Sequence, residues 1–363
     1  MRYFLSILIL CVVFGSTQAQ IGGRTSYDFL GLSENARIAA IGGDNVSVVD
    51  KDPNLARYNP ASINDSMVGY VSVNYLPFYA DVNKSSVAGV FDFGKVGPLA
   101  IGVQYINYGE INEVDFSGNV LGQSFNPREY ALSVGKSHVI GPFAMGANLK
   151  FVGSHIGDYS AFATMIDAGG IWKHPTRAFT IGMTVNNLGV NLKRYHPDSP
   201  VNLPLDVKLG ASYKLEHMPL RFSTTVHHLH KYDIQYLDPV RSATTDANGN
   251  EVLGEKKVSE QIARHFIFGG EFLIADGFNV RVGYNHLRRK ELRRDVRAGG
   301  AGFSFGFMLR VKRFEFNYSR TYFHVVGGSN VLTLTTNLNG MISKKARPAK
   351  KNKDNFPAQW DNE

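Results

Sequence analysis

Cysteine is almost absent from this chain of 363 residues, in which Cys11 is the only one. It lies within an apolar run near the N-terminus and follows Leu10, where a lipoprotein signal would need a small residue. We therefore predict a mature protein without a thiol, a disulfide or a lipid anchor.

Long apolar runs are missing beyond the N-terminus. Arg2, the apolar run at 4–14 and the small residues in STQA at 16–19 predict a cleaved signal peptide at residues 1–19, with the mature chain starting at Gln20. No later run is long enough for a membrane-spanning helix. A chain exported without such a helix is either released or built into an outer membrane as a β-barrel.

The charge of the chain is mildly basic, with a formal net charge of +8. An exported protein rarely meets nucleic acid, so we expect none as a partner. Outer-membrane lipid and lipopolysaccharide carry anionic groups that a basic surface attracts, and a solvated surface without a partner explains the same charge.

Residues 262–287 contain the clearest alternation of apolar and polar residues. Most of their apolar side chains fall on even positions on both sides of Asp276-Gly277, as in Phe268, Phe272, Val280 and Tyr284. Period two is typical of strands with one apolar face. A three-residue loop at 275–277 with a left-handed Gly277 would pair 274 with 278, 272 with 280 and 268 with 284, which keeps the apolar side chains together.

The same alternation recurs and predicts fourteen strands. Their second face is small and polar, as at Thr180, Thr184, Gly302 and Ser304, which suits a barrel with lipid outside and water or a plug inside. We predict an all-β fold, a 14-stranded antiparallel transmembrane β-barrel spanning residues 67–343. The strands are expected at about 68–78, 87–93, 98–108, 128–136, 142–153, 160–173, 177–188, 204–215, 219–229, 263–275, 277–287, 298–309, 312–322 and 330–342.

The predicted connections differ in length between the two ends of the barrel. Those after even-numbered strands are short, whereas the long ones, at 109–127, 189–203, 230–262 and 288–297, follow odd-numbered strands. Outer-membrane barrels have short turns in the periplasm and long loops outside. This asymmetry predicts the orientation, and a soluble sandwich has no reason to show it.

The two flanks of the barrel differ from it in composition. Residues 20–66 are rich in turn formers, and Ser33 before Ala36–Ala40 and Gly42-Gly43 predicts a short capped helix, so we expect a plug. Residues 344–363 are polar, basic and proline-containing, which predicts a disordered periplasmic tail.

Two groups of residues have the spacing of metal sites. Asp50, Asp52 and Asn54 match the start of a calcium loop, but the glycine and glutamate expected later in the loop are absent. His228 and His230 could share a strand face beside His227, yet no third ligand is visible nearby. We predict no metal site and regard the histidines as polar residues of the barrel rim.

Ser133 and Lys136 have the Ser-x-x-Lys spacing of penicillin-binding enzymes. That chemistry needs a helical turn, and in a strand an odd separation places the two side chains on opposite faces. We expect neither an enzyme nor a cofactor.

A basic group in the predicted outer loop at 288–297 is the candidate partner-binding site. Its cations could hold lipopolysaccharide phosphates or an acidic partner, or could simply be solvated. The residues are Arg288, Arg289, Lys290, Arg293 and Arg294.

Several segments resemble known families. ARIAAIGGDNVSVVDKDPNLARYNPASI at 36–63, placed before fourteen strands, resembles the N-terminal segment of long-chain fatty acid transporter-like (FadL-like) outer-membrane barrels. YDFL at 27–30, IGVQYINYGEI at 101–111, MGANLK at 145–150 and PLRFSTTVHHLHKYD at 219–233 resemble the PorQ family of the type IX secretion system.

The PorQ resemblance implies a non-enzymatic outer-membrane anchor that holds the surface protein PorZ. The attachment complex implied with it includes the PorU sortase and the PorV barrel, and it processes secreted cargo and attaches it to lipopolysaccharide. No family catalytic residues carry over. The alternative is a FadL-like transporter of hydrophobic small molecules, which needs an apolar pocket in the lumen. A passive porin is a third reading, against which the expected plug argues.

Overall fold

The computed structural model describes residues 25–115, 117–196, 202–235, 243–245, 251–253, 256–291, 300–324 and 327–339. The predicted signal peptide and the predicted tail lie outside these ranges. No helix in the described part of the chain is long and apolar enough to cross a membrane.

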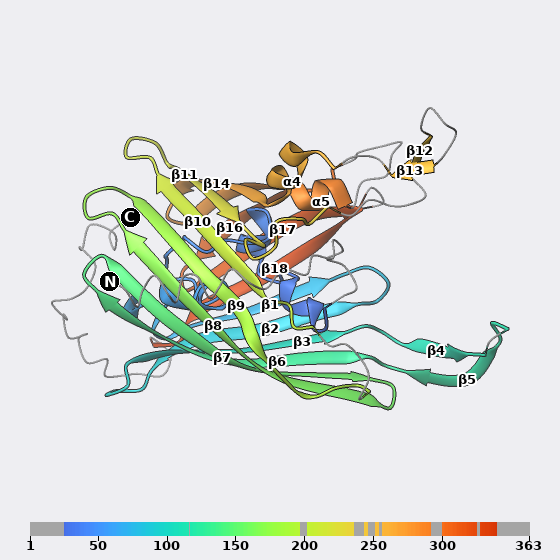
Figure 1. The fold of residues 1–363 in the computed structure, drawn as a ribbon. Helices are drawn as coiled ribbons and strands as arrows, with labels where there is room; N and C mark the ends of the chain where they lie inside the picture. The colour runs from blue at the N-terminus through green and yellow to red at the C-terminus, as the bar shows by residue number, and fades with distance from the viewer. Residues whose placement is uncertain are drawn as a thin grey trace, which may run out of the picture.

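Fourteen described strands close into one antiparallel barrel (Figure 1), so the predicted fold class is confirmed. Neighbours in sequence pair around the ring, and β1 pairs with β18 to close it, with Tyr70 opposite Asn337. The barrel strands are β1 (Tyr70–Pro77), β2 (Asn83–Asp92), β3 (Pro98–Asn107), β6 (Arg128–Ile140), β7 (Phe143–Ile156), β8 (Tyr159–Lys173), β9 (Phe179–Lys193), β10 (Asp206–Lys214), β11 (Leu220–Val226), β14 (Phe266–Ala275), β15 (Phe278–Asn285), β16 (Phe303–Val311), β17 (Phe314–His324) and β18 (Gly327–Asn337).

The two faces of the barrel wall differ in polarity, as the alternation predicts. On β18, Leu332 and Leu334 are exposed on the outside, whereas Thr333 and Thr335 are buried in the lumen. Exposed apolar side chains of the same kind lie on strands all around the barrel. An apolar outer band with a polar interior is typical of barrels that cross a bilayer.

The hairpin of β14 and β15 has the predicted pairing over most of its length. Phe268 lies opposite Tyr284 and Phe272 opposite Val280. At the turn the prediction is wrong, because Ala275 pairs with Phe278 and Gly277 is not left-handed. An irregularity between Phe272 and Ala275 takes up the extra residue within β14, which permits a two-residue turn without changing the rest of the register.

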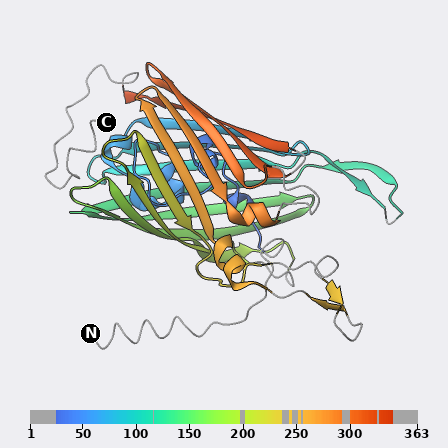
Figure 2. The same ribbon diagram turned by 90° about the horizontal axis from the view of Figure 1, so that it is seen from above.

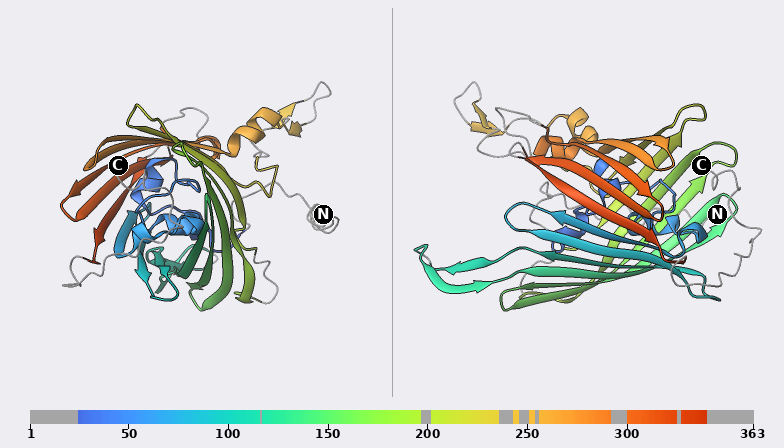
Figure 3. Two further views of the ribbon diagram at one scale, coloured as in Figure 1. Left: turned by 90° about the vertical axis from the view of Figure 1, so that its left-hand side faces the viewer. Right: turned by 180° about the vertical axis from the view of Figure 1, so that it is seen from behind.

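The N-terminal segment before β1 lies inside the barrel (blue in Figure 3). We call residues 25–69 the plug. Helix α2 packs against β15 to β18, and the 3-10 helix η2 packs against β6, β7 and β8. All helical elements of the plug are short. The plug contains η1 (Asp28–Gly31), α2 (Ala36–Ala40), α3 (Leu55–Tyr58), η2 (Pro60–Ser62) and η3 (Asp65–Met67).

The start of α2 differs from the prediction that Ser33 caps it. Asn35 is the cap, and its side-chain oxygen accepts a hydrogen bond from the Ile38 amide at 2.9 Å. The Ser33 hydroxyl instead lies 2.7 Å from the Tyr58 hydroxyl, so tertiary contact decides its partner. After the helix, Gly42 and Gly43 adopt positive φ angles, as expected of the residues that stop it.

The long connections contain ordered elements that the alternation did not reveal. They are β4 (Ile111–Val114) with β5 (Val120–Phe125), β12 (Ala243–Thr245) with β13 (Glu251–Leu253), α4 (Val258–Arg264) and α5 (His286–Glu291). All lie at one end of the barrel, and the β4–β5 hairpin extends far beyond its rim (Figures 1 and 2). We call this end the outer mouth.

The outward apolar face gives a first prediction. Phe307 lies in the middle of β16 and is 37% exposed on the outer surface. We expect Phe307→Arg to lower the free energy of unfolding in lipid by about 2–4 kcal/mol, because the charge must enter the hydrocarbon region. The change is measured by urea unfolding of the barrel folded into vesicles.

Val120→Arg is the matched control, since Val120 is 61% exposed on the β4–β5 hairpin, beyond the barrel. It should change stability by less than about 0.5 kcal/mol. Equal effects at the two positions would contradict a lipid-facing wall.

Candidate functional site: the plugged lumen and its outer mouth

Polar side chains of the barrel wall bind the backbone of the plug. The plug has little regular secondary structure, so its buried amide and carbonyl groups need other partners. The wall supplies hydroxyl and amide side chains from several strands. The pairs are the Ala36 amide with Thr333 Oγ1 at 2.9 Å, the Gly42 amide with Ser304 Oγ at 3.1 Å, Thr180 Oγ1 with the Ser47 carbonyl at 2.7 Å and Asn148 Nδ2 with the Ala56 carbonyl at 2.8 Å. The predicted polar lumenal face is therefore a binding surface for the plug.

Wall glycines let the plug backbone approach closely. A Cβ atom added at Gly146 would collide with the backbone of Pro60, and one added at Gly283 would collide with the backbone of Ile41 and Gly42. No side chain fits at these two places while the plug keeps its position. Part of the glycine content of the strands is thus explained by the plug.

One buried ion cluster joins the plug to β11, β14 and β15. Glu271 accepts hydrogen bonds from Arg37 Nε at 3.0 Å, Arg221 Nη1 at 3.0 Å and Arg281 Nε at 2.9 Å. Asp50 of the plug lies 2.9 Å from Arg37 and 3.4 Å from Arg221. Two carboxylates thus share three guanidinium groups, and the plug is linked to the wall through both Arg37 and Asp50.

A second ion cluster holds the start of the plug. Glu34 lies 2.5 Å from Arg57 Nη1 and 2.9 Å from Lys84 Nζ of β2. Lys84 also donates to the carbonyl groups of Phe29 and Leu32, both at 2.6 Å. Burial by itself raises the pKa of Glu34, but the two cations outweigh it and lower that pKa to about 2.

The predicted partner-binding cations lie against the chain's own residues where they are described. The Arg288 guanidinium lies 4.8 Å from the centre of the Phe323 ring and abuts Gly43 of the plug. Arg289 Nη1 donates to the Ala301 carbonyl at 3.3 Å, and Lys290 pairs with Glu260 at 2.9 Å. Arg293 and Arg294 lie outside the described residues. A role in partner binding stays a prediction.

The residues of the other sequence motifs also have clear positions. Asp50 belongs to the arginine cluster, and Asp52 accepts a hydrogen bond from the Asn54 amide at 3.0 Å. Ser133 lies in β6 with its hydroxyl 3.3 Å from the Gly102 carbonyl, while Lys136 is exposed on the other face. The strand therefore separates Ser133 from Lys136, as expected.

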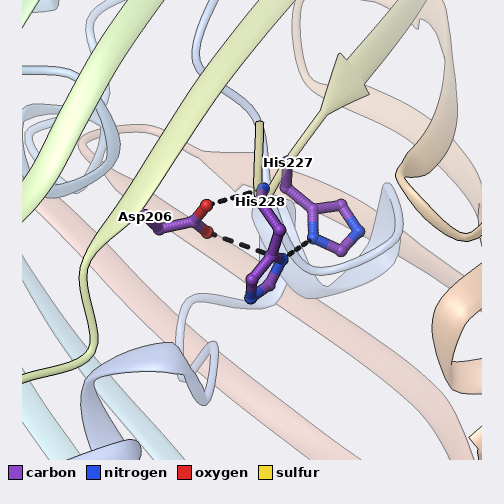
Figure 4. Close-up of side chains that lie close together, drawn as sticks. All are labelled: Asp206, His227 and His228. Carbon is purple, nitrogen blue, oxygen red and sulfur yellow. Dashed lines mark hydrogen bonds and ion pairs between the residues drawn. The ribbon is translucent and has the colours of Figure 1, made fainter. Parts of the chain in front are cut away.

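One group of side chains at the outer mouth could hold a metal ion (Figure 4). Asp206 begins β10, and His227 and His228 follow β11. Asp206 Oδ1 accepts from the His228 amide at 2.7 Å, and His227 Nδ1 faces His228 Nδ1. Sequence reasoning found the two histidines but missed Asp206, which only strand pairing brings close.

The β4–β5 hairpin exposes apolar side chains on its surface. Ile111, Val114, Val120 and Leu121 are all exposed, and the hairpin lies beyond the rim rather than in the lipid-facing wall (Figure 2). Exposed apolar groups outside both core and membrane are typical of surfaces that contact another protein.

The lumen near the outer mouth contains an apolar cluster. Phe29 and Leu30 of the plug pack there with Ile106, Val152 and Met165 of the wall. These side chains fill the space between η1 and the ends of β3, β7 and β8.

A transporter, a FadL homologue and a hydrocarbon channel are among the solved structures that are similar to this chain. The toluene transporter TbuX of Ralstonia pickettii is 12% identical, with 85% of this chain and 99% of that chain covered and a TM-score of 0.47. A FadL homologue of Pseudomonas aeruginosa is 12% identical over 84% and 98% of the two chains, with a TM-score of 0.44. A mutant of TodX, described as a monoaromatic hydrocarbon channel, is 11% identical over 84% and 99%, with a TM-score of 0.47.

Neither the known protein families nor the curated proteins give a match to this sequence. At these low identities and TM-scores, the structural similarity does not indicate a function for this chain. The class of the protein rests on its own topology, a closed 14-stranded antiparallel barrel with an N-terminal plug.

The arginine cluster gives a second prediction. Glu271→Gln leaves the buried Arg37 and Arg281 and the half-buried Arg221 with too few negative partners, so we expect it to destabilise the folded barrel by about 3–5 kcal/mol. Urea unfolding of the refolded barrel measures the change. Arg310→Ala is the control, because Arg310 pairs with Glu315 at 2.8 Å on the surface and its loss should cost less than about 1 kcal/mol. A comparable loss in both variants would contradict the buried cluster as the link.

The Glu34 cluster gives a third prediction, on pH. The ordinary pKa of a glutamate is 4.5, and that of Glu34 is lowered to about 2 in the fold, so its ionised form stabilises the plug above pH 4.5. This contribution should disappear as the pH falls from about 4.5 to about 2. The free energy of unfolding is measured against pH for the wild type and for Glu34→Gln.

The difference between the two proteins should shrink across that interval. A difference that does not change with pH would show that Glu34 is not ionised in the folded protein. Glu113→Gln, on the exposed β4–β5 hairpin, is the control and should leave the pH profile unchanged.

Proposed function

We propose that this chain is an outer-membrane anchor that holds a surface protein at the outer mouth of the barrel. The observation that carries the proposal is the β4–β5 hairpin, which extends beyond the rim and exposes Ile111, Val114, Val120 and Leu121. Such a hairpin offers both apolar side chains and an unpaired strand edge, and these are features that a partner protein can bind.

The filled lumen supports this proposal over passage of a solute. Two buried ion clusters, around Glu271 and around Glu34, fix the plug to the wall. Wall side chains also bind the plug backbone, so displacement of the plug from the lumen would require those contacts to break. A barrel built in this way suits a rigid mount in the membrane.

The resemblance to the PorQ family suggests the partner. On that basis the protein belongs to the type IX secretion system and holds a PorZ-type surface protein, with PorU and PorV as further components of the attachment complex. The signal peptide predicted at 1–19 and the apolar outer band agree with an integral location in the outer membrane of a Gram-negative bacterium.

The second candidate is a transporter of hydrophobic small molecules, the kind of function named for TbuX and TodX. The observation that favours it is the apolar cluster of Phe29, Leu30, Ile106, Val152 and Met165 at the outer mouth. A small apolar solute could enter there if η1 moved away, but it would then meet the polar lumen below.

The test is a pull-down of tagged protein from detergent-solubilised outer membrane of the source bacterium, followed by mass spectrometry. The wild type should bring down a PorZ-type surface protein. The triple variant Val114→Ser, Val120→Ser and Leu121→Ser should recover at least tenfold less of it, because the apolar contact is lost. The double variant Asn112→Ala and Gln123→Ala, which alters only polar residues of the same hairpin, is the matched control.

All variants are first checked for the heat-dependent gel mobility of a folded barrel. Recovery of a folded barrel alone, together with loss of toluene uptake in cells that lack the protein, would overturn the anchor and favour the transporter. Equal recovery of the partner by the apolar and polar variants would show that the partner does not bind the apolar residues of this hairpin.

A further inference from the structure

We propose that Asp206, His227 and His228 form a binding site for a divalent transition-metal ion, with Zn²⁺ as the best fit. The site lies on the lumenal side of the outer mouth, and it rests on side-chain geometry rather than on the anchor function. Its donor set is two imidazole nitrogens and one carboxylate oxygen, a set that zinc sites with an open fourth position use.

The backbone after β11 brings the two histidines to one side. Thr225 and His227 continue the lumenal face of the strand, and in regular β-structure the next residue would point outward. His228 has a φ of +57° instead, which turns the chain and brings its ring against that of His227 (Figure 4). A left-handed conformation is strained for a residue other than glycine, so the surroundings must hold this turn in place.

Asp206 fixes that turn and completes the donor set. Its Oδ1 accepts the His228 amide at 2.7 Å, and its Oδ2 lies 4.0 Å from His228 Nδ1. The three candidate ligand atoms lie within 4.8 Å of one another. Zinc bonds of about 2.0–2.2 Å set ligand atoms about 3.4 Å apart, so side-chain shifts of about 1 Å suffice.

The nearby charged groups leave the Asp206 carboxylate usable. Lys208 lies 3.6 Å from Asp206 Oδ2, but it pairs more closely with Asp44 of the plug, at 2.5 Å. Asp44 thus supplies a second negative charge beside the lysine. A metal ion could therefore bind the Asp206 carboxylate, because Lys208 already has Asp44 as its closer partner.

The other histidines nearby do not compete for the same role. Both ring nitrogens of His265 face backbone carbonyls, those of His227 at 2.7 Å and Tyr232 at 3.2 Å. The His230 ring centre lies 6.0 Å from that of His228, outside the compact group. The pair that the sequence suggested, His228 with His230, is therefore replaced by His227 with His228.

The experiment uses the full-length barrel in detergent, purified by a tag without histidines and stripped with a chelator. Calorimetric titration with Zn²⁺ should give one saturable site per chain. Titration with Co²⁺ should give the visible absorption of a four-coordinate ion with nitrogen and oxygen ligands. His227→Ala and Asp206→Asn should each weaken Zn²⁺ binding at least tenfold.

Two further variants separate binding from folding. His228→Asn keeps a residue that tolerates positive φ but removes the imidazole, so it should stay folded and lose binding. His230→Ala is the matched control and should bind as the wild type does. Heat-dependent gel mobility confirms the fold of each variant.

Absence of saturable Zn²⁺ binding in the folded wild type would overturn the site and leave Asp206 as a structural cap on the turn at His228. Binding that survives His227→Ala and His228→Asn equally would place the ion elsewhere and overturn the proposal too. Loss with His230→Ala alone would contradict the assignment of ligands.

Discussion

The need of buried backbone for hydrogen-bond partners dominates this structure. The plug carries five short helical elements joined by irregular chain, and most of its residues are buried. Wall side chains such as Thr333, Ser304 and Asn148 meet that need, which explains why the lumenal face is rich in hydroxyl and amide groups. The ion clusters then fix the position of the plug, because the one around Glu271 ties it to β11 and β14 and the one around Glu34 ties it to β2.

The strand pattern could be predicted from sequence because it depends on a local rule. Inward and outward positions alternate, so Leu332 and Leu334 against Thr333 and Thr335 suffice to define a wall strand. The turn at Gly277 could not be predicted, because a bulge within β14 shifts the pairing by one residue without disturbing the apolar pattern. The β4–β5 hairpin escaped notice for a related reason: a strand pair free of the core needs no clean alternation.

The candidate sites were harder to predict because their members come together through tertiary structure. Asp206 lies about twenty positions before the histidines in the chain and reaches them through the pairing of β10 with β11. The local sequence does not predict the positive φ of His228, which turns its ring toward His227. Likewise, the basic run from Arg288 looks like free loop charge in the sequence, yet α5 directs Arg288 to Phe323 and Lys290 to Glu260.

The close fit between wall glycines and the plug has a consequence for how the chain is assembled. Gly146 and Gly283 leave room for backbone but not for a bulkier segment, and β1 follows directly after the plug. A barrel closed without the plug would leave Glu271 with Arg221 and Arg281 but without Arg37. If the plug is enclosed while the sheet is still open, its contacts with the wall form before the pairing of β1 with β18 closes the barrel.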